Sequence, residues 1–268
     1  MDFDFVHLSD IHISSSPEIL ISLGLRNKEF FDKWSMNSWK GNFITAVKMV
    51  NSLKVSFTII SGDLTETGCK EDFQAYLEMQ KMFNMPVYPV PGNHDVGNVG
   101  TWQGLQGSFR NYEQFVGKPY YSFNYDNCHF IGLCSSLITG SVADIENLDK
   151  RRKEQNDWFL KDLAIASGTG YFHIFVFMEY PPQGGDSLRC TKDLYNLLPI
   201  FAKYRVDAVF SGHMHDNIEK KYKNVRLITT TSTTDSYHNP EGPGFRLVHV
   251  SENMFSSEFI PIIDKRGK

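Results

Sequence analysis

The chain is poor in cysteine and in clustered positive charge. Its four cysteines contain no C-x-x-C pair, so buried thiols in a reduced compartment are a better interpretation than a disulfide framework. The net charge is −4 at pH 7, and no basic block or basic amphipathic stretch is present. General binding to nucleic acid, including a DNA nuclease activity, is therefore not expected.

Long apolar runs are also missing. No stretch approaches the length of a transmembrane helix, and the first apolar run is too short for a signal peptide and carries Asp2 and Asp4. We therefore expect no membrane association and a cytoplasmic location. With 268 residues, 41% of them hydrophobic, and no internal repeat or linker, the chain is expected to form a single domain over residues 1–268.

What the sequence does contain is a series of short apolar runs that end in polar residues. Residues 2–8, 55–60, 87–90 and 206–210 are predicted strands. The polar residues that follow them are, in order, Asp10-Ile11-His12, Asp63, Asn93-His94-Asp95 and His213-Met214-His215. Predicted helices over 42–53 and 70–83 separate the first three strands, which indicates a parallel βαβ core. These side chains should then share one crevice at the carboxyl ends of the strands.

The middle of the chain predicts an additional sheet. Residues 120–125 and 128–133 alternate or are strongly apolar and are joined by Asp126-Asn127, so they predict a hairpin. A further strand over 172–177 ends at Glu179-Tyr180-Pro181, between predicted helices over 153–165 and 194–204. The change from parallel to antiparallel pairing indicates a second sheet rather than a second domain.

The Asp-x-His and His-x-His pairs suit metal binding. Residues two apart in an extended chain point to the same side, so Asp10 and His12 can reach one point. A pair of this kind taken alone is more often a capping residue and a surface histidine. Because His213 and His215 repeat the arrangement, and other polar ligands follow the remaining strands, the set indicates two adjacent divalent metal ions.

These residues resemble the calcineurin-like metallophosphoesterase family over nearly the whole chain. The family's motif order is Asp-x-His, Gly-Asp, Gly-Asn-His-Asp/Glu, a histidine near a proline-containing loop, and Gly-His-x-His, and all but one place is matched. Segments 117–123, 155–158 and 244–248 look like the branch of class III cyclic nucleotide phosphodiesterases and calcineurin-like phosphoesterase domain-containing phosphatases. The resemblance implies an α/β fold, a four-layer α/β/β/α sandwich of two mixed sheets flanked by helices.

The resemblance also implies roles for individual residues. It assigns Asp10, His12 and His215 to metal 1, Asn93 and His213 to metal 2, and Asp63 to a bridging position. His94 would stabilise or protonate the leaving oxygen, and Asp95 would orient it. The two ions, Mn, Fe, Zn or Mg, would support attack by a metal-bridging hydroxide on a phosphomonoester, such as a phosphoprotein, or on a phosphodiester.

Glu179 is the departure from the family pattern, because a histidine is usual at its position. Its carboxylate could bind metal 2 with a hard oxygen, which favours Mn, Mg or Fe over Zn. It could instead point away and leave a weak metal 2, or the position could have been changed by engineering. His173 cannot supply the missing imidazole, because six residues of strand displace it by about 20 Å. We expect Glu179 to be retained as a ligand with altered affinity.

Two classes of function follow from these residues. The first is a metal-dependent phosphoesterase, which could act on a cyclic nucleotide. The second is a weakly active or inactive binding module on the same fold, as in the retromer subunit that resembles these enzymes, and the presence of His94 favours the enzyme. Residues 13–40 are either a candidate lid or substrate-contacting insertion, or a few helical turns packed on the domain. A phosphate ester is the predicted partner, and nothing in the sequence identifies a protein partner.

Overall fold

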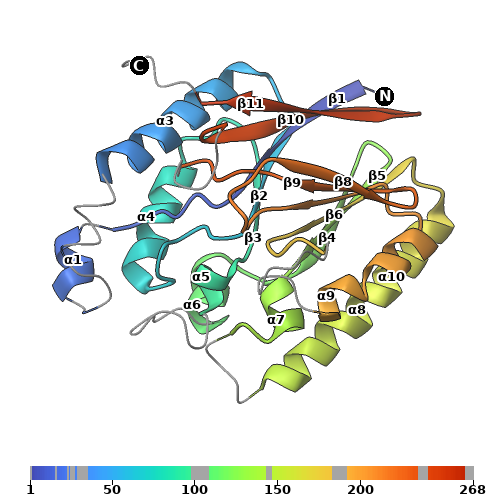
Figure 1. Ribbon diagram of the computed structural model, residues 1–268, viewed down its shortest axis with the longest axis horizontal. Helices are drawn as coiled ribbons and strands as arrows, with labels where there is room; N and C mark the ends of the chain where they lie inside the picture. Colours follow the sequence, from blue (N-terminus) through green and yellow to red (C-terminus); the bar gives the residue numbers. More distant parts are fainter. Residues whose placement is uncertain are drawn as a thin grey trace.

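The computed structural model describes residues 2–15, 17–22, 24, 28, 36–97, 109–142, 147–182, 192–234 and 241–262. Within them, two mixed sheets pack face to face and helices cover both outer faces (Figure 1). The predicted α/β class, with two mixed sheets flanked by helices, is confirmed.

The first sheet contains the expected parallel core. Its order is β11 (Phe255–Pro261), β10 (Gly244–Ser251), β1 (Asp2–Leu8), β2 (Phe57–Ser61) and β3 (Val87–Val90). Strands β1, β2 and β3 are parallel, and α3 (Met36–Ser52) and α4 (Lys70–Gln80) make the crossovers between them. Strand β10 pairs antiparallel with β1 and places Val248 opposite Phe5.

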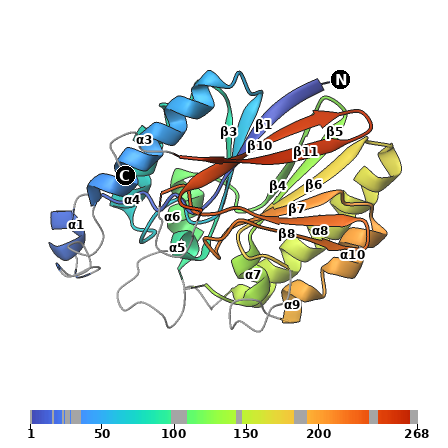
Figure 2. The ribbon, with the colours of Figure 1, turned by 45° about the horizontal axis from the view of Figure 1, so that its top comes forward.

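The second sheet continues the layered arrangement. Its order is β4 (Tyr121–Tyr125), β5 (Cys128–Leu133), β6 (His173–Met178), β7 (Ala208–Ser211), β9 (Val225–Thr229) and β8 (Ile218–Tyr222). The four central strands are parallel, while β4 and β8 are antiparallel edges. Helices α8 (Leu148–Thr169) and α10 (Leu198–Lys203) lie along its outer side (Figure 2). The hairpin predicted around Asp126-Asn127 is confirmed.

Shorter helices lie in the connections of both sheets. They are α1 (Pro17–Ser22), α5 (Asn93–Val96), α6 (Phe109–Phe115), α7 (Ser135–Thr139) and α9 (Lys192–Tyr195). The helix predicted over 194–204 is divided into α9 and α10, with Pro199 in the first turn of α10. Proline is tolerated there because the first helical N–H groups have no partner within the helix.

The core between the sheets is aromatic. Phe5 stacks on Phe57 with ring centroids 5.3 Å apart, and Phe177 stacks on Phe210 at 5.0 Å. Phe130 contacts Phe5 edge-on at 5.7 Å and so joins the two sheets. Because large rings bury much apolar area and favour stacked or edge-on pairs, this core fixes one sheet against the other. It thereby fixes the carboxyl ends of β1, β2 and β3 relative to those of β6 and β7.

No helix among the described residues is both long enough and apolar enough to cross a membrane. The predicted lid at 13–40 falls partly on residues outside the described ranges, so it stays a prediction. The single domain over 1–268 also stays a prediction.

Candidate metal centre

The carboxyl ends of five strands bring the predicted ligands to one edge of the two sheets. Strand β1 leads to Asp10 and His12, β2 to Asp63 and β3 to Asn93. From the second sheet, β6 leads to Glu179 and β7 to His213 and His215. The backbone N–H of Gly212 donates to the carbonyl of Glu179 at 3.0 Å, which ties the ends of β6 and β7 together.

Five of the ligand candidates have a left-handed backbone. Their φ angles are 50° at Asp10, 44° at His12, 45° at Asp63, 65° at His213 and 54° at His215. Few residues other than glycine adopt such angles, although Asp and His do so more readily than most. The backbone strain is concentrated where the side chains must turn inward directly after a strand, as is common at functional sites.

Two glycines make room for the carboxylates. A Cβ atom at Gly92 would lie 2.1 Å from the backbone nitrogen of Asp63 and 2.2 Å from its Oδ1. A Cβ atom at Gly212 would lie 2.2 Å from Oδ2 of Asp10. The glycines beside Asn93 and His213 are therefore part of the site, because any side chain there would displace a carboxylate.

Asp10, His12 and His215 form a first group whose potential ligand atoms all lie within 4.8 Å of one another. Nε2 of His215 lies 3.3 Å from Nε2 of His12 and 3.5 Å from Oδ1 of Asp10. Burial acts to raise the pKa of the Asp10 carboxyl, but the neighbouring imidazole of His215 outweighs it, and the pKa falls to about 2. This group presents one ionised carboxylate and two imidazoles to a common point.

Asp63, Glu179 and His213 form a second group of the same size. Glu179 is fully buried, and its Oε1 lies 3.1 Å from Nδ1 of His213. Its Oε2 accepts a hydrogen bond of 2.7 Å from the backbone N–H of Asn93. The carboxylate thus points into the group, which disagrees with the interpretation that Glu179 turns away.

Asp63 lies between the two groups. Its Oδ2 is 3.7 Å from Nε2 of His12, and its Oδ1 accepts a hydrogen bond of 2.9 Å from the backbone N–H of His94. Burial, followed by the negative charge of Glu179, raises the pKa of the Asp63 carboxyl well above its ordinary value. Burial and the charge of Asp10 do the same to the pKa of Glu179. Carboxylates so close together repel one another when they are charged, so they can all be ionised at the same time only if cations lie beside them.

The side-chain oxygen of Asn93 is a further candidate ligand atom. Its Oδ1 atom is buried, and no hydrogen bond to it is found within the described part of the chain. An unpaired buried amide oxygen costs free energy, so it is expected to have a ligand. The donor set of two carboxylates, an imidazole and this amide oxygen fits a divalent cation.

Glu66 belongs to the site although the sequence did not single it out. Its Oε2 lies 3.0 Å from Nδ1 of His12, and its backbone carbonyl accepts a hydrogen bond of 2.7 Å from Nδ1 of His94. The sequence feature that could have indicated Glu66 is its position three residues after Asp63, in the same loop.

Asp95 is placed differently from the prediction. Its carboxylate accepts hydrogen bonds from the backbone N–H groups of Gly92, Leu64 and Thr65 and from the Thr65 hydroxyl, at 2.8–3.0 Å. It therefore joins the loops after β2 and β3, and the carbonyl of Glu66 takes the predicted role of orienting the His94 ring. No hydrogen bond between the Asp95 carboxylate and the His94 ring is found among the described residues.

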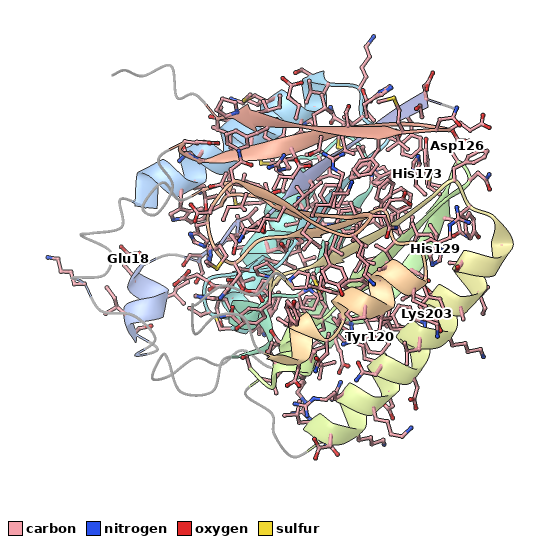
Figure 3. All side chains as sticks on the ribbon, turned by 45° about the vertical axis from the view of Figure 1, so that its right-hand side comes forward. Glu18, Tyr120, Asp126, His129, His173 and Lys203 are labelled. Atoms are coloured by element: carbon pink, nitrogen blue, oxygen red, sulfur yellow. The ribbon has the colours of Figure 1, made fainter. Side chains whose placement is uncertain are left out.

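His173 lies at the far end of β6 from Glu179, close to the β4–β5 turn at Asp126 (Figure 3). It contacts the backbone carbonyl of Ser251 at 2.9 Å and Asp207 at 3.5 Å. The prediction that His173 does not replace the missing histidine agrees with this placement.

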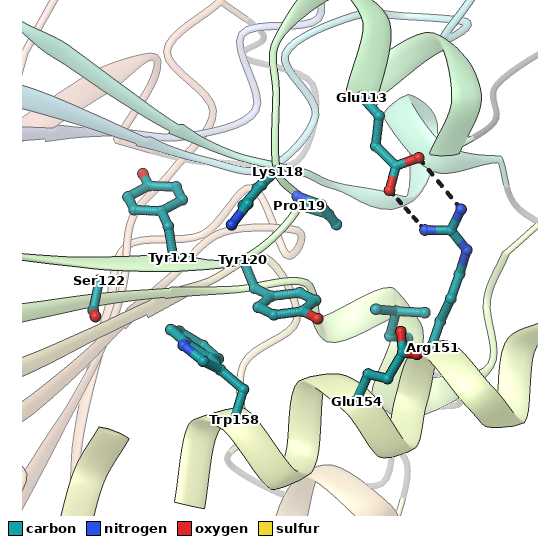
Figure 4. Close-up of a pocket in the computed structure, with 10 residues that line it drawn as sticks. Glu113, Lys118, Pro119, Tyr120, Tyr121, Ser122, Arg151, Glu154 and Trp158 are labelled. Carbon is teal, nitrogen blue, oxygen red and sulfur yellow. Dashed lines mark hydrogen bonds and ion pairs between the residues drawn. The ribbon is translucent and has the colours of Figure 1, made fainter. Parts of the chain in front are cut away.

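A cavity of about 540 Å³ lies apart from these ligands, beside the start of β4 (Figure 4). Tyr120 and Trp158 line it with ring centroids 5.0 Å apart, and Arg151 pairs with Glu113 across it at 2.7 Å. None of the candidate ligands lines this cavity, so it is separate from the metal centre.

Known proteins share the sequence pattern and the fold. A family model described as calcineurin-like phosphoesterase matches residues 3–217, which include every candidate ligand. Serine/threonine-protein phosphatase CPPED1 of Rattus norvegicus is 25% identical over 240 residues, covering 83% of this chain and 74% of that protein. The probable glycerophosphodiester phosphodiesterase GpdQ of Arcobacter nitrofigilis is 23% identical over 235 residues, covering 85% of this chain and 77% of that protein.

Among solved structures, purple acid phosphatase PPD1 from yellow lupin superposes with a TM-score of 0.69 at 12% identity. The match covers 98% of this chain and 52% of that one. At this level of identity the likeness concerns the fold, and it agrees with the two-sheet arrangement described above.

Proposed function

The chain belongs to the calcineurin-like phosphoesterase family of metal-dependent phosphoric ester hydrolases, and we propose that it hydrolyses its substrate with two metal ions held at the strand ends. The family match confirms the predicted class of reaction. The observation that carries the proposal is the buried Asn93 Oδ1, which has no hydrogen bond in the described residues. The backbone N–H of the same residue donates to the carboxylate of Glu179, a member of the second ligand group.

We assign one ion to Asp10, His12 and His215, and the other to Asn93, Glu179 and His213, with Asp63 shared between them. Two adjacent divalent ions would supply a water of lowered pKa and neutralise charge on the phosphate. The oxygen-rich second group favours Mn, Mg or Fe over Zn. The cytoplasmic location stays a prediction.

His94 is assigned to the leaving group. Its Nδ1–H donates to the Glu66 carbonyl, and its Nε2 lies 3.9 Å from Oδ2 of Asp63, facing the centre. Because the neutral ring then keeps its proton on Nδ1, donation from Nε2 requires the imidazolium form. The protonated ring would pass the Nε2 proton to the leaving oxygen and regain it from water.

The relatives leave two substrate classes open. One relative is named as a protein phosphatase and another as a probable phosphodiesterase, so both a phosphomonoester and a phosphodiester are candidates. A binding module without turnover is the other class of function to test.

The test is turnover of a chromogenic phosphomonoester and of its diester counterpart, with and without added Mn²⁺, in the wild type and in His94→Gln. We expect Mn-dependent turnover of at least one ester. The loss in His94→Gln should be about 10²- to 10⁴-fold in kcat, with unchanged Mn binding, because the proton donor is removed and no ligand is. Mn binding without any turnover of either ester would instead identify a binding module.

A further inference from the structure

Glu179 adds a carboxylate to the second ligand group, and cations bound there would keep it ionised. The residue is fully buried, and both of its carboxylate oxygens have partners, Oε2 at the Asn93 N–H and Oε1 at the His213 ring. It therefore cannot move its charge into solvent without losing both contacts.

The backbone is shaped around this side chain. A Cβ atom at Gly62 would lie 2.4 Å from Cγ of Glu179 and 2.6 Å from its Cβ, and the φ angle of Gly62 is +91°. The side chain of Glu179 thus packs directly against the backbone of Gly62. The loops after β2 and β6, which contain Gly62 and Glu179, therefore fix the position of this carboxylate.

The ligand groups consequently carry three carboxylates. Asp10, Asp63 and Glu179 are the acidic members, and the remaining donors are three imidazoles and an amide. A histidine at 179 would leave two carboxylates. Within the described ranges no lysine or arginine forms an ion pair with these three carboxylates, and the ion-pair partners found there are histidines.

We propose that this additional carboxylate makes the protein select phosphate esters with a single negative charge, and thus phosphodiesters over phosphomonoesters. The inference rests on the proposed function. A phosphomonoester carries about two negative charges above a pKa near 6, whereas a diester carries one. At an effective dielectric constant of about 20, one charge about 5 Å away changes an affinity by more than tenfold per unit of charge on the ligand.

Binding of two anions that are not turned over tests the selection without relying on activity. The Mn-loaded wild type, Glu179→His and Glu179→Gln are titrated by calorimetry with inorganic phosphate and with dimethyl phosphate at about pH 8. The number of bound Mn²⁺ ions is measured in each protein first. Glu78→Gln, which removes an exposed carboxylate from α4, is the matched control.

We expect the ratio of the two dissociation constants to shift at least about tenfold in favour of inorganic phosphate in Glu179→His. Any Glu179→Gln protein that retains both ions should shift in the same direction, and Glu78→Gln should not shift. An unchanged ratio in Glu179→His with two Mn²⁺ ions bound would overturn the selection and leave the proposed function intact. A wild type that binds no Mn²⁺ would overturn both.

Discussion

Glu66 orients two histidines that have different tasks. Its carboxylate faces Nδ1 of His12, which leaves Nε2 of that ring directed at His215 and Asp63. Its backbone carbonyl fixes the ring of His94 in the same way. A carboxylate behind a ligand histidine sets the orientation of the ring and raises its basicity, so Glu66 is a positioning residue for the first ligand group.

Replacing Glu66 should weaken metal binding at the first ligand group. We expect Glu66→Ala to lower Mn²⁺ affinity about 10- to 100-fold, and Glu66→Gln to lower it less because an acceptor oxygen remains near His12. Calorimetric titration with Mn²⁺ measures this, with Glu78→Gln as the control for loss of a remote charge. Wild-type affinity in Glu66→Ala would show that the His12 ring is held by other contacts.

His7 is a buried histidine outside the ligand set. Its Nδ1 contacts Thr230 Oγ1 at 2.8 Å, and its Nε2 contacts Ser61 Oγ at 2.6 Å. Burial, with a smaller effect from the charge of Arg246, lowers its pKa from 6.5 to about 3. The folded protein therefore keeps this ring neutral at pH values where the unfolded chain binds a proton.

Stability should fall on acidification because of His7. From about pH 6.5 down to about pH 3, the unfolded state gains a proton that the folded state does not, which costs up to ~1.4 kcal/mol per pH unit. His7→Gln lacks this effect, so the gap between the unfolding free energies of the two proteins should narrow as the pH is lowered. Urea unfolding at about pH 7 and about pH 5 checks this, and a constant gap would contradict the lowered pKa.

Most residues of the candidate metal centre could be predicted from the sequence, because their type and their position after a strand indicate metal binding. Asp10, His12 and Asp63 each follow an apolar strand, and that position alone predicted their meeting at one edge. Glu66 was missed because an acidic residue in a polar loop looks like solvated surface. Asp95 was given the wrong partner, because a neighbour in sequence does not disclose which way its side chain turns.

At the scale of elements, the site depends on tight turns that follow each strand. Gly62 occupies such a turn, and a Cβ there would meet Glu179 as well as strain the backbone. Gly168, in contrast, lies in α8, where a Cβ would have no atom within 4 Å. The two glycines form a matched pair for substitution by alanine.

Gly62→Ala should disturb both the fold and the second ligand group. We expect a loss of about 1–3 kcal/mol in the free energy of unfolding and weaker binding of one Mn²⁺ ion, because Glu179 must move. Gly168→Ala should be neutral or stabilise by up to about 1 kcal/mol through helix propensity. Equal effects of the two substitutions on Mn²⁺ binding would show that the close packing of Glu179 on Gly62 does not control the second ligand group.

The elements themselves were predicted unevenly. Strands β1, β2 and β3 are apolar runs separated by amphipathic helices, so their parallel order followed from the pattern. Strands β8–β11 were not predicted. In β8 the residues Glu219, Lys220 and Lys221 are exposed, and a strand at the edge of a sheet lacks the apolar run that identifies a buried one.

In the molecule as a whole, the site depends on the two sheets being held in a fixed position relative to each other. The carboxyl ends of β1, β2 and β3 supply one part of the ligand set, and those of β6 and β7 supply the other. Phe5 of the first sheet contacts Phe130 and Phe177 of the second sheet, at 5.7 and 6.0 Å between ring centroids. Their pairing was not readable from the sequence, because periodicity shows that a residue is buried and not which sheet it faces.

Anomalous X-ray scattering from crystals grown with Mn²⁺ tests directly whether two adjacent ion positions share Asp63. We predict two Mn²⁺ peaks per chain, about 3.5–4 Å apart, with Asp63 contacting both and Glu179 contacting one of them. A single peak, or two peaks without Asp63 between them, would contradict the claim.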